Sequence, residues 1–137
     1  MIVDTSALFA IASGEIGWEE LRRAIASSHC VVPATVLTEL QLVTQSRMDA
    51  VPAIARKLLT DLLETGLEIA PFEHRHADLT ALARERYGKG NGTGGLLNFG
   101  DLMVYAIAKQ RGEALLCTGR DFASTDLQIH PASRLEP

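Results

Sequence analysis

Short apolar runs alternate along the chain with longer segments in which apolar residues recur every three or four positions. The short runs are typical of buried strands, and the longer segments have the spacing of amphipathic helices. Because parallel strands need crossover connections, this order predicts an α/β fold with a short central parallel sheet flanked by helices. The strands are expected at residues 1–3, 30–32, 67–70 and 114–117, with a possible fifth strand at 127–129.

Capping residues and glycines set the expected bounds of the helices. Thr5 and Ser6 offer N-cap oxygens to a first helix that runs to about Ala12, where Gly14 is a suitable stop. Asn98 is expected to cap the last helix, which reaches the residue before Gly112. The remaining helices are expected over residues 17–28, from the N-cap Thr35 through Val43, over 51–63 and over 73–87.

Composition and charge narrow the class of protein. The chain has 137 residues, of which 47% are hydrophobic and 22% charged, and this favours one domain over residues 1–137 with a polar tail at 131–137. No apolar run approaches the ~20 residues of a membrane span and no signal peptide is recognised, so a cytoplasmic location is expected. The net charge of −4 argues against broad, sequence-independent binding of nucleic acid. Cys30 and Cys117 lack metal-site spacing and are expected to be inert core thiols.

Four carboxylates are candidates for one site. Asp4 directly follows the first strand and Asp121 lies just past the fourth, and right-handed crossovers bring both to one edge of the sheet. Asp101, in the first turn of the last helix, and Glu39, in the third helix, can reach the same edge.

Each position also has an ordinary structural explanation. Asp4 is a good N-cap, and the helix dipole favours Asp101 by ~0.3–1 kcal/mol. Glu39 can hold its carboxylate in water at the boundary of an apolar face.

Carboxylates that converge must either take up protons or bind cations. Oxygen ligands without His or Cys select Mg²⁺ or Mn²⁺, and two such ions ~3.5–4 Å apart can support phosphodiester hydrolysis.

His74 and His76, at the expected exposed start of a helix, lack the spacing of a metal site. Residues 88–95 contain five glycines and are expected to form a flexible loop without the order of a phosphate-binding loop.

At four places the sequence resembles the PIN-domain ribonucleases, and within them the VapC toxins of bacterial type II toxin–antitoxin pairs. The similar positions are VDTSA at 3–7, Glu39, LNFGD at 97–101 and TGRDF at 118–122. The resemblance implies a PIN fold in which Asp4, Glu39, Asp101 and Asp121 are catalytic and bind Mg²⁺ or Mn²⁺.

The resemblance also implies a substrate and partners. Ser6 would hydrogen-bond near the metal or the scissile phosphate. The substrate would be RNA, with tRNA and ribosomal RNA as the usual targets of the family. A VapB-type antitoxin would block the groove, and the toxin would form a homodimer.

One position departs from the family pattern. Arg120 stands where relatives often carry an acidic or amide residue, so Asp121 supplies the fourth carboxylate alone or with help from Asp126. Arg120 either holds an RNA phosphate or is a solvated loop arginine, and with Thr118 and Ser6 it makes the expected substrate-binding set.

Two other classes of protein remain as alternatives. A receiver-like Mg²⁺-binding module would need an acidic pair after the first strand and a lysine after a late one, and neither is present. A non-catalytic PIN-like module that acts through protein partners stays open. No basic patch or aromatic platform in the sequence indicates which RNA would be cleaved.

Overall fold

The computed structural model describes residues 1–136 and has six helices and four strands in alternating order, as the sequence predicts. Their bounds are β1 (Ile2–Val3), α1 (Thr5–Ser13), α2 (Trp18–Ala26), β2 (Val31–Pro33), α3 (Ala34–Gln45), α4 (Val51–Glu64), β3 (Glu68–Ala70), α5 (His74–Tyr87), α6 (Phe99–Arg111) and β4 (Leu115–Leu116).

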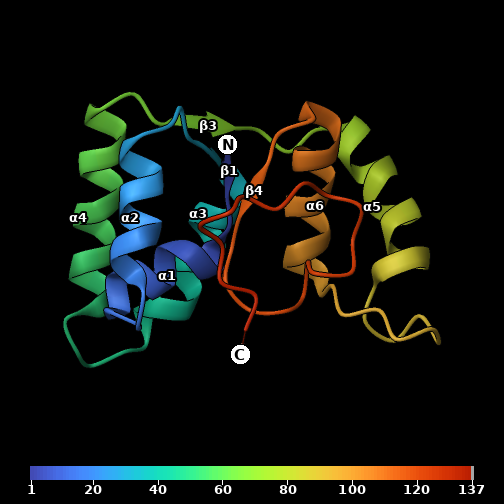
Figure 1. The fold of residues 1–137 in the computed structure, drawn as a ribbon, viewed down its shortest axis with the longest axis horizontal. Coiled ribbons are helices and arrows are strands. Elements are labelled where there is room, and N and C mark those ends of the chain that lie inside the picture. Colours follow the sequence, from blue (N-terminus) through green and yellow to red (C-terminus); the bar gives the residue numbers. More distant parts are fainter. Residues whose placement is uncertain (137) are drawn as a thin grey trace.

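The four strands form one parallel sheet in the order β3-β2-β1-β4. Ile2 in β1 pairs with Val31 on one side and with Leu115 on the other. Figure 1 shows α1, α2 and α4 on one side of the sheet and the antiparallel pair α5 and α6 on the other. All four strands therefore end at the same edge, where the loops to α1 and α3 and the segment after β4 begin.

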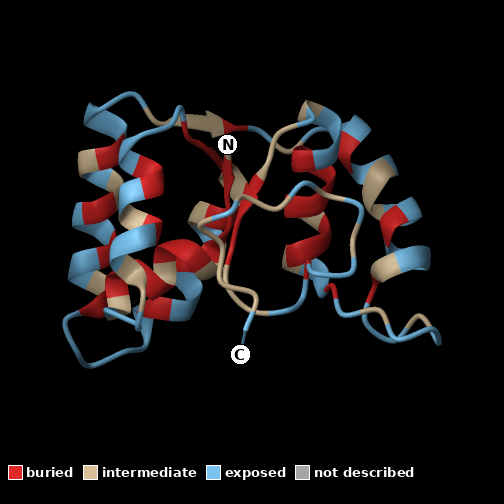
Figure 2. Cartoon of the chain, viewed as in Figure 1, coloured by how far each residue is buried: buried red, intermediate tan, exposed pale blue. Residues whose placement is uncertain are grey.

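The core lies where the helices face the strands. The largest fully buried side chains come from β1, β2, β4 and the inner faces of α1, α2, α3 and α6, and Figure 2 shows this burial along the strands and along the inward helix faces. Cys30 and Cys117 are buried free thiols, as expected. No helix within residues 1–136 is long and apolar enough to cross a membrane.

The carboxyl-terminal segment adds hydrogen bonds to β4 without forming the possible fifth strand. Residues 127–129 contribute a single bridge, Leu115 to Ile129, rather than a fifth strand. The expected polar tail is not a free tail, because Arg134 forms a bridge with Thr118 and its N–H donates to the Cys117 carbonyl at 3.0 Å. The backbone of the described tail therefore extends hydrogen bonding along β4, which a polar side-chain composition does not reveal.

The N-cap expected at Thr35 was wrong, and of the alternatives for the first helix the N-cap at Asp4 is correct. Asp4, not Thr5 or Ser6, caps α1, and its side chain accepts from the Ser6 N–H at 3.0 Å. Pro33 precedes α3 in the N-cap position, so Thr35 lies inside the first turn with a buried hydroxyl that has no hydrogen-bond partner. In both cases the helix begins one or two residues earlier than expected, directly after the strand.

Some helix faces were also assigned wrongly. Val43, Ile54 and Leu82 are exposed, although they are apolar residues within expected amphipathic helices. His76 is buried instead of exposed, since its Nδ1 accepts from the Glu73 N–H at 2.9 Å in a capping box. Periodicity identifies an apolar face but not which part of that face a neighbouring element covers.

The amino-terminal edge of the sheet carries compensated charges. The Arg111 guanidinium, at the end of α6, donates to both carboxylate oxygens of Glu68 at 3.0 and 3.1 Å and to Glu113 at 2.8 Å. His29 also contacts Glu68 at 3.1 Å. This network ties β3 to the ends of two neighbouring segments by charge-assisted hydrogen bonds.

Candidate active site

Asp4 is fixed at the carboxyl-terminal edge by the sheet itself. It follows β1 without a linker, and its N–H donates to the Leu116 carbonyl of β4 at 3.0 Å. Its side chain is 5% exposed and begins α1 as the N-cap. The Asp4 carboxylate therefore both caps α1 and belongs to the site, so the two explanations given for this residue are compatible.

Ser6 joins the two central loops of this edge. Its hydroxyl donates to Asp4 Oδ2 and accepts from the Thr118 N–H at 3.0 Å. The loop after β1 and the loop after β4 are therefore held together beside the Asp4 carboxylate. Of the three expected substrate-binding residues, Ser6 and Thr118 lie here.

Asp101 enters the site through a capping box at the start of α6. Asn98 Oδ1 accepts from the Asp101 N–H at 2.9 Å, and Asp101 Oδ2 accepts from the Asn98 N–H at 3.0 Å. Only one carboxylate oxygen is used in this way, and Oδ1 accepts no hydrogen bond from residues 1–136. Asp101 therefore does stabilise the start of α6, as the structural explanation predicts. Because it uses only Oδ2 for this, Oδ1 is free to bind a ligand.

Glu39 reaches the site from α3 across Gly100. A Cβ atom at position 100 would overlap Glu39 Oε2, so a larger residue there would displace the Glu39 carboxylate from the first turn of α6. This explains a glycine that the sequence analysis treated only as part of a motif. The signal was present in the sequence, as a glycine inside a helix start, where it is otherwise unfavourable.

Asp121 is exposed, and its neighbour Phe122 is 2% exposed and anchors the segment to the core. Arg120 is also exposed and does not line the cavity described below. Asp126 points elsewhere, because it accepts from the Tyr105 hydroxyl at 2.7 Å and from Lys109 at 2.6 Å. Asp126 is therefore not positioned to help Asp121.

The four carboxylates line one cavity of about 310 Å³. None of them forms an ion pair within residues 1–136. The cavity wall also contains no Lys, Arg or His, so negative charge gathers there without a protein cation to balance it. The lining residues are Asp4, Thr5, Ser6, Phe9, Glu39, Val43, Asn98, Asp101, Thr118, Asp121 and Phe122.

This crowding changes the protonation of the buried members. Burial, together with the charges of Asp4, Asp121 and Glu39, raises the pKa of Asp101 to about 7, although the hydrogen bond from the Asn98 N–H lowers it. Burial also raises the pKa of Asp4, although the Ser6 hydrogen bonds oppose the rise. Without a cation, the folded protein disfavours full ionisation of this cavity.

The carboxylate oxygens of the cavity are the ligands that a hard divalent cation prefers. The side chains are not yet close enough together to coordinate such an ion. Among residues 1–136, no three His, Cys, Asp or Glu side chains are arranged to hold a metal ion as they stand. The free Asp101 Oδ1 suits an additional ligand, since Asp101 lines the cavity and only its Oδ2 accepts a hydrogen bond from residues 1–136.

Comparisons with known proteins agree with this geometry. A family model described as PIN domain matches residues 1–127. Ribonuclease VapC42 of Mycobacterium tuberculosis is 38% identical over 129 residues, which cover 93% of this chain and 97% of that protein.

Two solved structures share the fold at lower identity. VapC20 of Mycobacterium tuberculosis, described as a sarcin-ricin loop cleaving toxin, matches with a TM-score of 0.69 and 20% identity over 92% of this chain and 95% of that chain. A toxin–antitoxin complex from Klebsiella pneumoniae contains a chain that matches with a TM-score of 0.67 and 17% identity, covering 95% of this chain and 96% of that one.

Proposed function

The chain belongs to the PIN-domain family, and we propose that it is an endoribonuclease that needs Mg²⁺ or Mn²⁺ and acts as the toxin of a toxin–antitoxin pair. The observation that carries the proposal is the single cavity with four carboxylates and no balancing cation. The name of the relative that is 38% identical, a ribonuclease, supports RNA as the substrate.

In this proposal Asp4, Glu39, Asp101 and Asp121 hold the metal. A divalent cation at such oxygens supplies charge stabilisation for a phosphodiester and lowers the pKa of bound water. Asp4 and Asp101 are the fixed members, since each is held by a hydrogen bond at a helix start. Glu39 and Asp121 are less constrained by hydrogen bonds, and they adjust when the cation enters.

Ser6 and Thr118 have positioning roles in the proposed reaction. The Ser6 hydroxyl orients the Asp4 carboxylate and accepts from the Thr118 N–H, so it fixes the distance between the two loops that flank the substrate. Arg120 is left as an exposed arginine near this edge, available to a phosphate but not part of the cavity wall.

The proposed partners are RNA, a VapB-type antitoxin and a second copy of the chain. The solved toxin–antitoxin complex, whose matching chain has the same fold, supports a protein partner of this kind. Ribosomal RNA and tRNA are the proposed substrate classes, and the description of VapC20 as a sarcin-ricin loop cleaving toxin supports a structured RNA target.

The proposal is tested by incubating the purified protein with total RNA in Mg²⁺, in Mn²⁺ and in EDTA. We expect discrete cleavage products with either metal, none in EDTA, and recovery when excess Mn²⁺ is added back. Cleavage that continues unchanged in EDTA would contradict the metal requirement. A protein that cleaves no RNA under any of these conditions would favour the non-catalytic alternative.

A further inference from the structure

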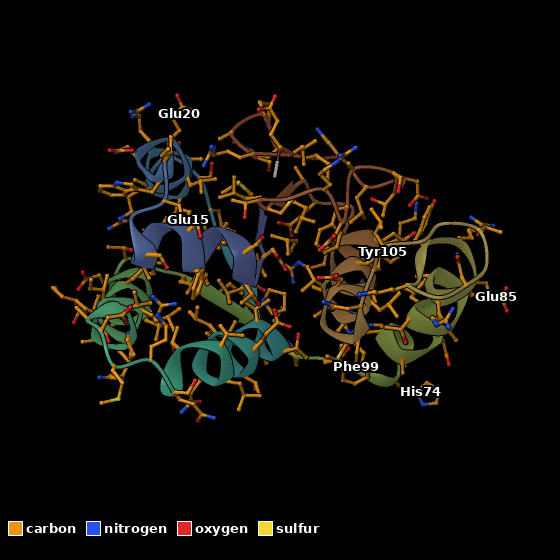
Figure 3. All side chains as sticks on the ribbon, turned by 90° about the horizontal axis from the view of Figure 1, so that it is seen from below. Glu15, Glu20, His74, Glu85, Phe99 and Tyr105 are labelled. Carbon is orange, nitrogen blue, oxygen red and sulfur yellow. The ribbon has the colours of Figure 1, made fainter. Side chains whose placement is uncertain are left out.

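An exposed aromatic ring lies directly beside the acidic cavity. Phe99 is the first residue of α6 and is 80% exposed, although it is a large apolar side chain. It follows Asn98 and precedes Asp101 by two positions, and both of those residues line the cavity. Figure 3 labels Phe99 at the beginning of α6, between the ribbons of α3 and α5. A ring in this position is accessible to a ligand that already occupies the cavity.

Phe99 also forms one wall of a separate groove between α5 and α6. The groove has a volume of about 380 Å³, within the ~300–1,000 Å³ of ordinary ligand sites. It is mostly apolar, and no carboxylate lines it. Its walls include Phe72, Ala81 and Met103, and its one charged lining residue is Arg84.

The glycine-rich segment holds Arg84 in place. A Cβ atom at Gly88 would collide with the Arg84 side chain, and one at Gly90 would lie 4.0 Å from its Nη2 atom. Within this loop, Asn91 Oδ1 accepts from the Gly95 N–H at 3.1 Å and Asn91 Nδ2 donates to the Glu85 carbonyl of α5 at 3.1 Å. The glycines thus leave room for an arginine that lies along the loop.

Two cations near this end of the groove have no acidic partner in the described part of the chain. Neither Arg84 nor Lys89 takes part in an ion pair, whereas Arg75 on the first turn of α5 pairs with Glu73. The Lys89 N–H donates to the Leu97 carbonyl at 2.8 Å, which puts the lysine backbone one residue from the cavity-lining Asn98. Two cations without an acidic partner within residues 1–136 therefore lie on α5 and in the loop after it, and this hydrogen bond joins that loop to the segment that leads into Asn98.

We propose that Phe99 and Arg84 form a binding site for an unpaired nucleotide of the RNA substrate, next to the phosphodiester held at the carboxylates. The base stacks on the Phe99 ring, and the Arg84 guanidinium binds a phosphate of the same strand. This inference rests on the proposed function, and it deepens it by assigning specificity for single-stranded RNA to residues outside the acidic cavity.

The charge distribution favours RNA over a protein as the occupant. With a net charge of −4 and four uncompensated carboxylates, the protein repels a polyanion unless cations lie beside the site. Arg84, in the wall of the groove that Phe99 also lines, and Lys89, in the loop after α5, supply those cations. An apolar protein surface would not need an unpaired arginine in its wall, because a buried charge without a partner is costly.

The first test measures binding in EDTA, where the proposed cleavage is stopped. The probe is a fluorescein-labelled single-stranded RNA of mixed sequence, about 12 nucleotides long, and its duplex with the complementary strand serves as the competitor. We expect Phe99→Ala to raise the dissociation constant about 5- to 100-fold, the range of one lost base stack. Phe99→Tyr restores binding. Leu82→Ala is the matched control, since Leu82 is also exposed, at 61%, but does not line this groove.

The second test uses salt dependence to identify the phosphate contact. Arg84→Gln should lower the slope of log Kd against log salt concentration by about 0.7, the value for one phosphate on a single strand. Arg56→Gln, which removes another cation without an ion pair from α4, should leave the slope unchanged. An equal loss of slope in both variants would mean that Arg84 acts only through net charge, and it would overturn the assignment of Arg84.

Three results would overturn the base-binding site, and none of them concerns catalysis. They are a wild-type protein that does not bind the single strand, a Phe99→Ala variant that binds as wild type does, and a Phe99→Ala variant that light scattering shows to be a monomer when the wild type is a dimer. The last result would assign the surface to contact between copies. Failure of the proposed ribonuclease function is a different result, in which total RNA incubated with the protein and Mn²⁺ stays intact.

Discussion

The two edges of the sheet treat carboxylates in opposite ways. At the amino-terminal edge, Glu68 is bound by Arg111 and His29, and these hydrogen bonds lower the pKa of Glu68. At the carboxyl-terminal edge, Asp101 has no cation, and burial raises its pKa to about 7. Both edges belong to the same four strands, so the sheet alone does not account for this difference. It comes from where the sequence places arginine.

The difference separates structural charge from functional charge. A carboxylate that already has a cation contributes to the folded state, and a second cation gains little by binding it. Carboxylates left without a partner cost stability until an external cation arrives. The carboxyl-terminal edge is also where parallel α/β sheets bind ligands. An unbalanced cluster at that edge is therefore evidence for a binding role, whereas acidic residues at the other edge are not.

The largest expected effect is on RNA cleavage. Asp101→Asn should lower the cleavage rate by more than ~100-fold, because even loss of a group that only supports a metal ligand costs 10- to 100-fold. Glu68→Gln, at the opposite edge, should leave the rate unchanged. The measurement is the initial rate of cleavage of total RNA in Mn²⁺ for both variants and the wild type. Equal activity of Asp101→Asn and Glu68→Gln would remove the distinction between the edges.

The next effect is on stability in the presence of metal. A ligand that binds only the native state stabilises it by about 4 kcal/mol at a thousand times its Kd. Wild type and Glu68→Gln should both gain this stabilisation from Mn²⁺ in denaturant titrations, and Asp101→Asn should gain little of it. A full gain in Asp101→Asn would show that the metal binds without this carboxylate.

Much of the site could be predicted because backbone topology alone brings it together. Asp4 and Asp121 follow adjacent parallel strands, and strand order along the chain is enough to put them at one edge. Asp101 was indicated by the capping signal of Asn98 three residues before it. These inferences need only local patterns and the handedness of crossovers.

What could not be predicted depends on side chains that meet across the fold. The position of Glu39 over Gly100 follows from how α3 packs against α6, and no local pattern encodes that approach. The exposure of Phe99 likewise depends on how closely α3 and α5 approach the beginning of α6. His76 was expected in water and is buried, because Gln110 on α6 lies within 3.2 Å of its Nε2. Each of these outcomes required knowledge of a neighbouring helix.

The smallest effect concerns the pH dependence of stability without metal, and the two edges should respond in opposite directions. The folded-state pKa of Asp101 is raised from 3.8 to about 7, so the stability associated with its neutral form is lost as pH rises toward 7. The folded-state pKa of Glu68 is lowered, so its contribution is present at neutral pH and is lost in acid. Removing each charge should therefore have opposite consequences at neutral pH.

The measurement is the free energy of unfolding in EDTA at about pH 5 and about pH 8. Relative to wild type, Asp101→Asn should gain about 1–2 kcal/mol between the two values, less than the ~2.6 kcal/mol that a pKa raised from 3.8 to about 7 gives over this interval, because the exposed side of the cavity at Asp121 admits water that screens the repulsion. The amide oxygen can keep the capping bond from the Asn98 N–H, so lost capping does not hide the gain. Glu68→Gln should be less stable than wild type by nearly the same amount at both pH values, because Glu68 is ionised throughout this interval and its contribution is lost only below its ordinary pKa of 4.5. If both variants shifted in the same direction, the carboxylates at the two edges would be energetically alike, and the raised pKa of Asp101 would not reflect an uncompensated cluster.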